Sequence, residues 1–137
     1  MADEDIELVK KAYAAFASGD IDAAVAAIAD DVVWIEPDEF PNGGRHDGRE
    51  AVRDYLQKSR AMWTELHSTV DVRRVGGRLV AIHSVSGTLA DGTPRENSVG
   101  DVYVVRDGVV VAMTAYATPE EALASAGEPA HRPTRDA

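Results

Sequence analysis

Four kinds of side chain could carry out chemistry in this chain: carboxylates, amides, phenols and imidazoles. The 137 residues include no cysteine, which excludes disulfide scaffolds, thiolate zinc sites, iron–sulfur clusters and a cysteine nucleophile. No G-x-S-x-G hydrolase motif or dinucleotide-binding fingerprint occurs. No two histidines have the spacing of metal ligands, and His46-Asp47 alone is not a metal site. We therefore expect any catalysis to use neither a cofactor nor a metal.

The composition is that of one acidic globular domain. There are 24 acidic and 14 basic residues, a formal charge of −10, and 45% of residues are hydrophobic, which is ordinary for a single domain of this length. The charge argues against a nucleic-acid partner. No apolar run approaches the roughly 18 residues of a membrane span, and the acidic N-terminus is not a signal peptide. We expect a cytoplasmic protein; its excess of arginine over lysine is typical of GC-rich bacteria.

Helices are expected first in the chain. Residues 3–18 should form a helix with one apolar stripe, made by Ile6, Val9, Tyr13 and Phe16. Asp20 should cap a second helix, whose apolar positions are Ile21, Val25 and Ile28. A strand over 32–36 and a Pro/Gly-rich loop over 37–48 follow. Asp47 and Glu50 resemble a capping box for a third helix that reaches about Arg60.

The second half of the chain is expected to be β-structure. Residues 65–75, 78–90, 94–106 and 109–117 are four runs rich in Val, Thr and Ile, separated by turn signals. Thr118-Pro119 begins a last short helix that Gly127 ends. This order predicts an α+β fold in which a curved antiparallel sheet, wrapped by the N-terminal helices, forms a cone with a small-molecule cavity. Residues 1–127 should be one domain, and 128–137 a mobile tail.

The sequence resembles a known superfamily. The element order, together with the segments YAAFASGD (13–20), ADDVVW (29–34) and VRDGVV (105–110), is similar to the nuclear transport factor 2-like superfamily. It looks closest to the SnoaL-like polyketide cyclases and the ketosteroid isomerases, over about residues 5–117. The resemblance implies a cystatin-like α+β barrel, a fold that hosts several reactions and also binding modules.

Two acidic residues of this sequence match functional residues of the ketosteroid isomerases. The general base of that family, an acid followed by proline, matches Glu36-Pro37, and its protonated oxyanion donor matches Asp101. The catalytic tyrosine of the family falls on Ala12, and Tyr13 points about 100° further round the helix. The resemblance therefore implies that Glu36 removes a proton beside a carbonyl while protonated Asp101 binds the enolate oxygen. Otherwise Glu36 is a solvated strand end, and Asp101 pairs with an arginine, Arg95 or Arg73.

Other side chains are candidates for substrate binding. Asn97 lies four residues before Asp101 and could orient a carbonyl oxygen or bond within the sheet. His46 could reach the cavity mouth from its loop and shuttle protons. His83 faces either the cavity or the outer sheet surface, because a slip of one residue reverses its direction. The candidate lining residues, each of which could instead be core, are Tyr13, Trp34, Tyr55, Met62, Trp63, Tyr103 and Met113.

Three functions remain open. The first is a cofactor-independent isomerase or aldol-type polyketide cyclase that acts on a hydrophobic carbonyl compound. The second is an epoxide hydrolase or dehydratase that uses Glu36, Asn97 and Asp101 around a water. The third is a non-catalytic ligand-binding or dimerisation module. We also expect a homodimer through the outer sheet face, with an apolar patch formed by Val102, Val104, Val110 and Tyr116.

Overall fold

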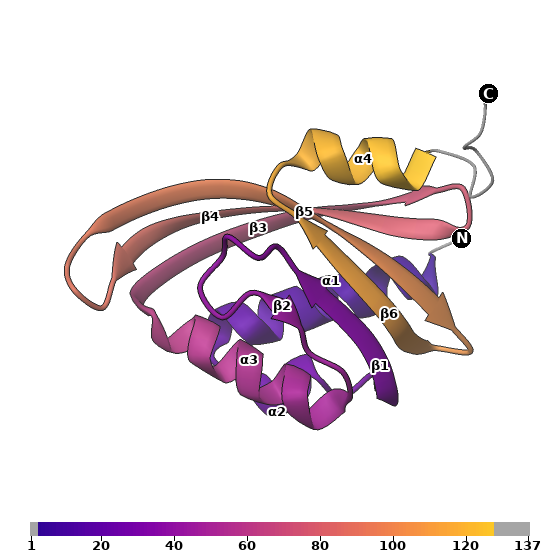
Figure 1. Ribbon diagram of the computed structural model, residues 1–137, viewed down its shortest axis with the longest axis horizontal. Coiled ribbons are helices and arrows are strands. Elements are labelled where there is room, and N and C mark those ends of the chain that lie inside the picture. The colour runs from indigo at the N-terminus through magenta and orange to yellow at the C-terminus, as the bar shows by residue number, and fades with distance from the viewer. Residues whose placement is uncertain (1–2, 128–137) are drawn as a thin grey trace.

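The computed structural model describes residues 3–127 and consists of one curved sheet with helices on both sides (Figure 1). Helices α1, α2 and α3 lie on one side of the sheet, and α4 lies on the other. The elements in chain order are α1 (Glu4–Ser18), α2 (Ile21–Ala24), β1 (Ile28–Glu36), β2 (Gly44–Arg45), α3 (Arg49–Ala61), β3 (Trp63–Val75), β4 (Arg78–Leu89), β5 (Pro94–Arg106), β6 (Val109–Tyr116) and α4 (Pro119–Gly127). The predicted tail at 128–137 lies outside the described residues.

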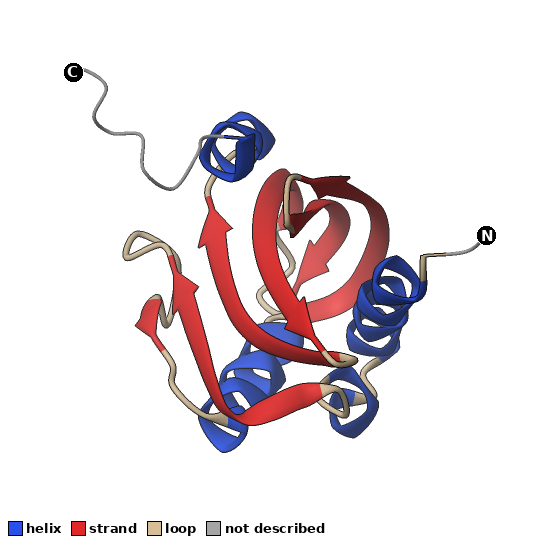
Figure 2. Cartoon of the chain, turned by 90° about the vertical axis from the view of Figure 1, so that its right-hand side faces the viewer, coloured by secondary structure: helices blue, strands red, loops and turns tan. Residues whose placement is uncertain are grey.

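The sheet is mixed, with strand order β2-β1-β6-β5-β4-β3. Strands β3 to β6 form the predicted antiparallel hairpins, but β1 runs parallel to β6. This parallel pairing brings the N-terminal strand beside the C-terminal one, which a hairpin pattern cannot predict. Figure 2 shows the strands curling through a wide arc without closing into a barrel. The predicted α+β class and curved sheet are confirmed.

Two of the predicted helix ends differ from the structure. Helix α1 begins as expected, with the Asp3 carboxylate accepting from the amide of Asp5 at 3.1 Å. Helix α2, however, ends at Ala24, because Ile28 pairs with Val110 of β6 and already belongs to β1. Helix α3 begins after Gly48 with no side-chain cap. The predicted capping box is wrong, since the Asp47 carboxylate accepts from Arg45 Nε instead, at 2.7 Å.

The core has two parts, on opposite faces of the sheet. The larger lies on the concave face, under α1 and α3, and includes Val110. The smaller lies beneath α4, where Val80 and Val102 pack on Ala122 and Ala126. The predicted outer apolar patch is therefore wrong for three of its members. Val110 lies in the larger core, α4 covers Val102, and Tyr116 packs against the core beneath α4, with its hydroxyl 2.7 Å from Ser125 Oγ. The homodimer itself stays a prediction.

Within residues 3–127, no helix is both long enough and apolar enough to cross a membrane.

Candidate functional site

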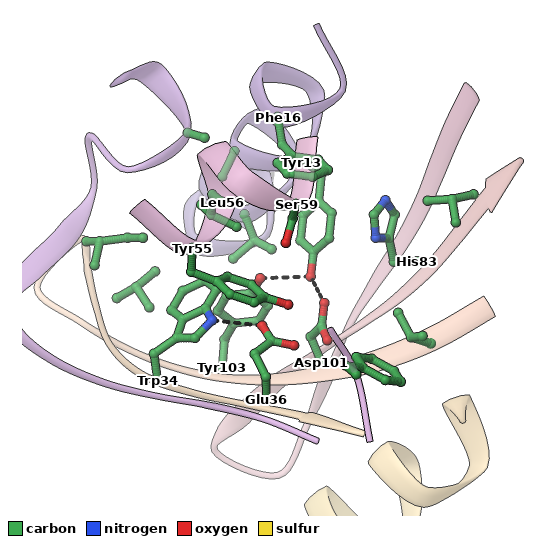
Figure 3. A pocket seen from close by; sticks show the side chains of 18 of the residues that line it. Tyr13, Phe16, Trp34, Glu36, Tyr55, Leu56, Ser59, His83, Asp101 and Tyr103 are labelled. Atoms are coloured by element: carbon green, nitrogen blue, oxygen red, sulfur yellow. Dashed lines mark hydrogen bonds between the residues drawn. The ribbon is translucent and has the colours of Figure 1, made fainter. Parts of the chain in front are cut away.

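A cavity of about 230 Å³ lies between the concave face of the sheet and the helices α1 and α3. Most of its lining is aliphatic or aromatic, and Figure 3 shows the side chains that converge on it. The carboxyl and imidazole groups among its lining residues are those of Glu36, Asp101 and His83. A mostly apolar cavity with a few convergent polar groups is the usual form of a small-molecule site.

Glu36 lies at the end of β1, just before Pro37, and is only 8% exposed. It is therefore not a solvated strand end. Trp34 Nε1–H donates a hydrogen bond to Glu36 Oε2 at 2.8 Å. Burial, and then the nearby charge of Asp101, raise the pKa of Glu36 to about 8, although hydrogen bonding from Trp34 and Tyr55 opposes this rise.

Asp101 lies on β5 and is 9% exposed. The hydroxyl of Tyr13 donates to Asp101 Oδ2, and the hydroxyl of Tyr103 donates to that of Tyr13 at 2.7 Å. Burial raises the pKa of Asp101 to about 6, while the bond from Tyr13 lowers it. The expected alternative of an arginine partner is wrong, because Arg73 pairs with Asp71 at 2.8 Å and Asp101 bonds the phenol.

The position of Tyr13 on the first helix differs from the expected one. The sequence places the family tyrosine on Ala12 and turns Tyr13 away, yet both residues line the cavity. The reason is that α1 presents a broad face, from Leu8 through Phe16, rather than a single line of residues. A residue 100° from the centre of such a face still reaches the site when its side chain is long.

Together, Glu36 and Asp101 hold one proton near neutral pH. Their pKa values, about 8 and about 6, belong to a pair that titrates in two steps. Each carboxyl group accepts a hydrogen bond that favours its ionised form, Asp101 from the Tyr13 hydroxyl and Glu36 from Trp34 Nε1–H.

His83 faces the cavity, which settles the question that its sequence position leaves open. Its Nε2 lies 2.6 Å from Ser68 Oγ on the neighbouring strand β3. Its ring meets the Tyr13 ring nearly edge to face, with centroids 4.7 Å apart. Burial lowers the pKa of His83 to about 4, so the imidazole is neutral.

The remaining candidates divide between the cavity and its surroundings. Tyr13, Trp34, Tyr55, Met62, Trp63 and Tyr103 line the cavity. Three residues do not. Asn97 is exposed and lies in a separate hollow, since four residues of extended strand carry it about 13 Å beyond Asp101. Met113 is 1% exposed within the core. His46 packs behind Tyr55 and donates to the carbonyl of Asn42 at 2.7 Å.

Two loop residues that line the cavity, Phe40 and Pro41, are not among the candidates that the sequence pattern predicts. Two successive turns fold this loop back: the amide of Phe40 donates to Pro37 O at 3.0 Å, and that of Gly43 to Phe40 O at 2.9 Å. The sequence did contain a signal for these two residues. The Pro/Gly-rich loop that follows the candidate acid Glu36 holds one aromatic residue, Phe40.

A metal site has no support from the geometry of residues 3–127, where no three His, Asp or Glu side chains gather as ligands would.

Comparisons with known proteins agree on the fold. A family model described as a SnoaL-like domain matches residues 9–113. No curated protein matches the chain. An NTF2-like protein of unknown function from Burkholderia pseudomallei is similar in structure, with a TM-score of 0.75 and 22% identity over 88% of this chain and 95% of that one.

Two further solved structures are similar and bear provisional functional names. One is provisionally named a polyketide cyclase, from Xanthomonas campestris, with a TM-score of 0.70 and 28% identity over 90% of this chain and 96% of that one. The other is provisionally named an isomerase, from Bacillus subtilis, with a TM-score of 0.69 and 21% identity over 82% of this chain and 85% of that one.

Proposed function

Because the chain belongs to the SnoaL-like family, we propose that its cavity performs cofactor-independent acid–base catalysis on a small hydrophobic carbonyl compound. The observation that supports this proposal most directly is the pair Glu36 and Asp101, two buried carboxyl groups that share one proton in an apolar cavity. Pairs of titratable groups with separated pKa values are typical of acid–base sites. The provisional names of two similar proteins, a polyketide cyclase and an isomerase, agree with this chemistry.

In the proposed reaction Asp101 is the base and Glu36 is the acid. The C–H bond beside the substrate carbonyl breaks, its proton passes to the Asp101 carboxylate, and its electron pair forms an enolate. The protonated carboxyl group of Glu36 donates a hydrogen bond to the enolate oxygen. Return of the proton to a conjugated carbon gives an isomerase. Attack of the enolate carbon on a second carbonyl forms a C–C bond and an alkoxide, which takes the proton held by Asp101, and gives a cyclase.

These roles reverse those that the resemblance implies, and the contact between Tyr13 and Asp101 is one reason. A carboxylate that accepts a phenol hydrogen bond is stabilised as the anion. Burial raises the pKa of Glu36 further, to about 8, although Glu36 also accepts from Trp34, so we take Asp101 as the ionised member of the pair. Glu36 lies in the field of that anion and keeps the proton.

The epoxide hydrolase alternative has less support. It requires an amide or a guanidinium beside the carboxylates to hold a water, yet neither asparagine nor arginine is among the described residues that line the cavity. The candidate that it relied on, Asn97, lies outside the cavity.

The test is deuterium exchange at carbons beside a carbonyl, followed by NMR for a panel of enones and β-ketoacyl compounds. Asp101→Asn removes the base and should lower the exchange rate about 10²–10⁴-fold. Glu36→Gln retains an N–H donor and should cost less. Glu39→Gln, in the exposed loop three residues away, is the control. Undiminished exchange in both active-site variants would exclude the proposal, and a larger loss in Glu36→Gln would restore the roles implied by the resemblance.

A further inference from the structure

His83 is a buried titratable residue that the proposed acid–base pair does not use. It is 9% exposed and lies in the cavity wall beside Tyr13 (Figure 3). Its Nε2 contacts Ser68 Oγ at 2.6 Å, whereas Nδ1 has no hydrogen-bond partner among residues 3–127. An unpaired polar atom in an apolar wall costs free energy until a ligand or a water satisfies it.

The contact with Ser68 offers one tautomer of the His83 ring a partner at Nε2. A neutral imidazole has one donor and one acceptor nitrogen, and burial keeps His83 neutral by lowering its pKa to about 4. Within the described residues, the Ser68 hydroxyl has no acceptor other than His83 Nε2. When Ser68 donates to Nε2, the ring proton resides on Nδ1. In that tautomer His83, a residue of the cavity wall, has a hydrogen-bond donor at Nδ1.

The strand register places this donor at a defined distance from the acid–base pair. His83 on β4 pairs with Val99 on β5, and Ala81 pairs with Asp101. His83 and Asp101 are thus diagonal neighbours on the same face of the sheet, with Cβ atoms roughly 7–8 Å apart. A ligand that reacts at Asp101 reaches His83 about one ring width away.

We infer that His83 is a second polar anchor of the cavity, whose Nδ1–H binds an oxygen of the carbonyl substrate remote from the reacting carbonyl. This inference rests on the proposed function for the position of the reacting carbonyl. It narrows the substrate class to ketones that carry a second acceptor oxygen, as a hydroxyl, ether or carbonyl, on the side away from the reacting one. The apolar lining surrounds the carbon skeleton, and the two polar ends fix its direction.

Binding of three small ketones tests the inference. The probes are 1-tetralone, 5-methoxy-1-tetralone, which adds an acceptor, and 5-hydroxy-1-tetralone, which adds an acceptor and a donor. The chain contains 2 tryptophans, and both line the cavity, so quenching of their fluorescence reports binding without turnover. Both oxygenated probes should bind about 5-fold more tightly than 1-tetralone, the gain of one net hydrogen bond.

Variants distinguish a hydrogen bond from His83 to the ligand from a general effect of His83 on the packing of the cavity. His83→Leu should remove the preference for both oxygenated probes, and His83→Asn, which keeps an N–H near the position of Nδ1, should retain part of it. Ser68→Ala no longer fixes the proton on Nδ1, so it should weaken the preference for the methoxy probe more than that for the hydroxy probe. Ser84→Ala, at the next position on β4, is the control and should bind as the unaltered protein does.

Equal binding of the three probes, a preference that survives in His83→Leu, or the absence of quenching by any of them would overturn the inference. Deuterium exchange into the same ketones reports on the acid–base pair separately. Exchange without a preference overturns only the anchor, and a preference without exchange overturns only the proposed function.

Discussion

The indole Nε1–H of Trp34 donates to Glu36 Oε2, 2.8 Å away, from two positions earlier on β1. Residues two apart on a strand share a face, so one short segment delivers both the acid and its donor to the cavity. Pro37 follows at once and directs the chain into the loop that covers the site. The Trp34 bond favours the ionised form of Glu36, while burial and the charge of Asp101 on β5 favour the protonated form.

Trp34→Phe should raise the pKa of Glu36 above its value of about 8, because the lost hydrogen bond favours the ionised carboxyl group. The alkaline limb of the exchange activity should move to higher pH by the same amount. A carbon-13 NMR titration of the glutamate side chains measures the pKa directly. Trp63→Phe alters the same cavity without touching a carboxyl group, and a comparable shift in that variant would contradict the assignment.

Tyr13→Phe should raise the pKa of Asp101 above about 6, since the phenol hydrogen bond is what lowers it. Less of the base is then ionised in mild acid, so deuterium exchange should fall about 10-fold at pH 6 and less at pH 8. Tyr103→Phe acts only through the Tyr13 hydroxyl and should give a smaller shift in the same direction. An equal loss at both pH values would indicate a packing defect instead.

The stability of the fold should fall as the pH rises from 6.5 to 8. Glu36 has a raised pKa, so the folded state keeps a proton that the unfolded chain releases, and this contribution is lost as the pH passes about 8. Over these 1.5 units the loss is about 2 kcal/mol. His83, with a pKa lowered to about 4, changes stability only below about pH 6.5.

Urea unfolding at several pH values measures this slope. Glu36→Gln removes the titrating group and should flatten the curve above pH 6.5, whereas Glu39→Gln should leave it unchanged. A slope that persists in Glu36→Gln would mean that another group holds the proton.

Much of this architecture is local in the sequence and could be predicted from it. Gly76-Gly77 and Asp107-Gly108 form the two-residue turns of two hairpins, and Asp91-Gly92 lies in the four-residue turn between β4 and β5, because tight turns favour glycine. The pattern Thr118-Pro119 begins α4, where the amide of Glu121 donates to Thr118 Oγ1 at 3.2 Å.

The features that the sequence could not determine depend on contacts between distant segments. The sequence predicts a second helix that extends too far, because the apolar Ile28 fits the spacing of both a helix and a strand. Its pairing with β6 places it in the strand. The direction of the Tyr13 hydroxyl follows from how α1 packs on the sheet. The contact between that hydroxyl and Asp101 follows in turn from this packing, so the family motif predicted the two carboxyl residues but not the phenol that bonds one of them.

Gly100→Ala should destabilise the protein, because α4 packs directly on the backbone of β5 at this position. A methyl group there would lie 2.4 Å from the Cβ of Ala122 and 3.1 Å from the Cα of Pro119. Overpacking of this kind costs about 1–3 kcal/mol, which urea unfolding measures as a lower midpoint. Gly77→Ala is the matched control, since nothing lies within 4 Å of its added methyl group. Equal stability of the two variants would show that α4 can move away from the sheet at little cost.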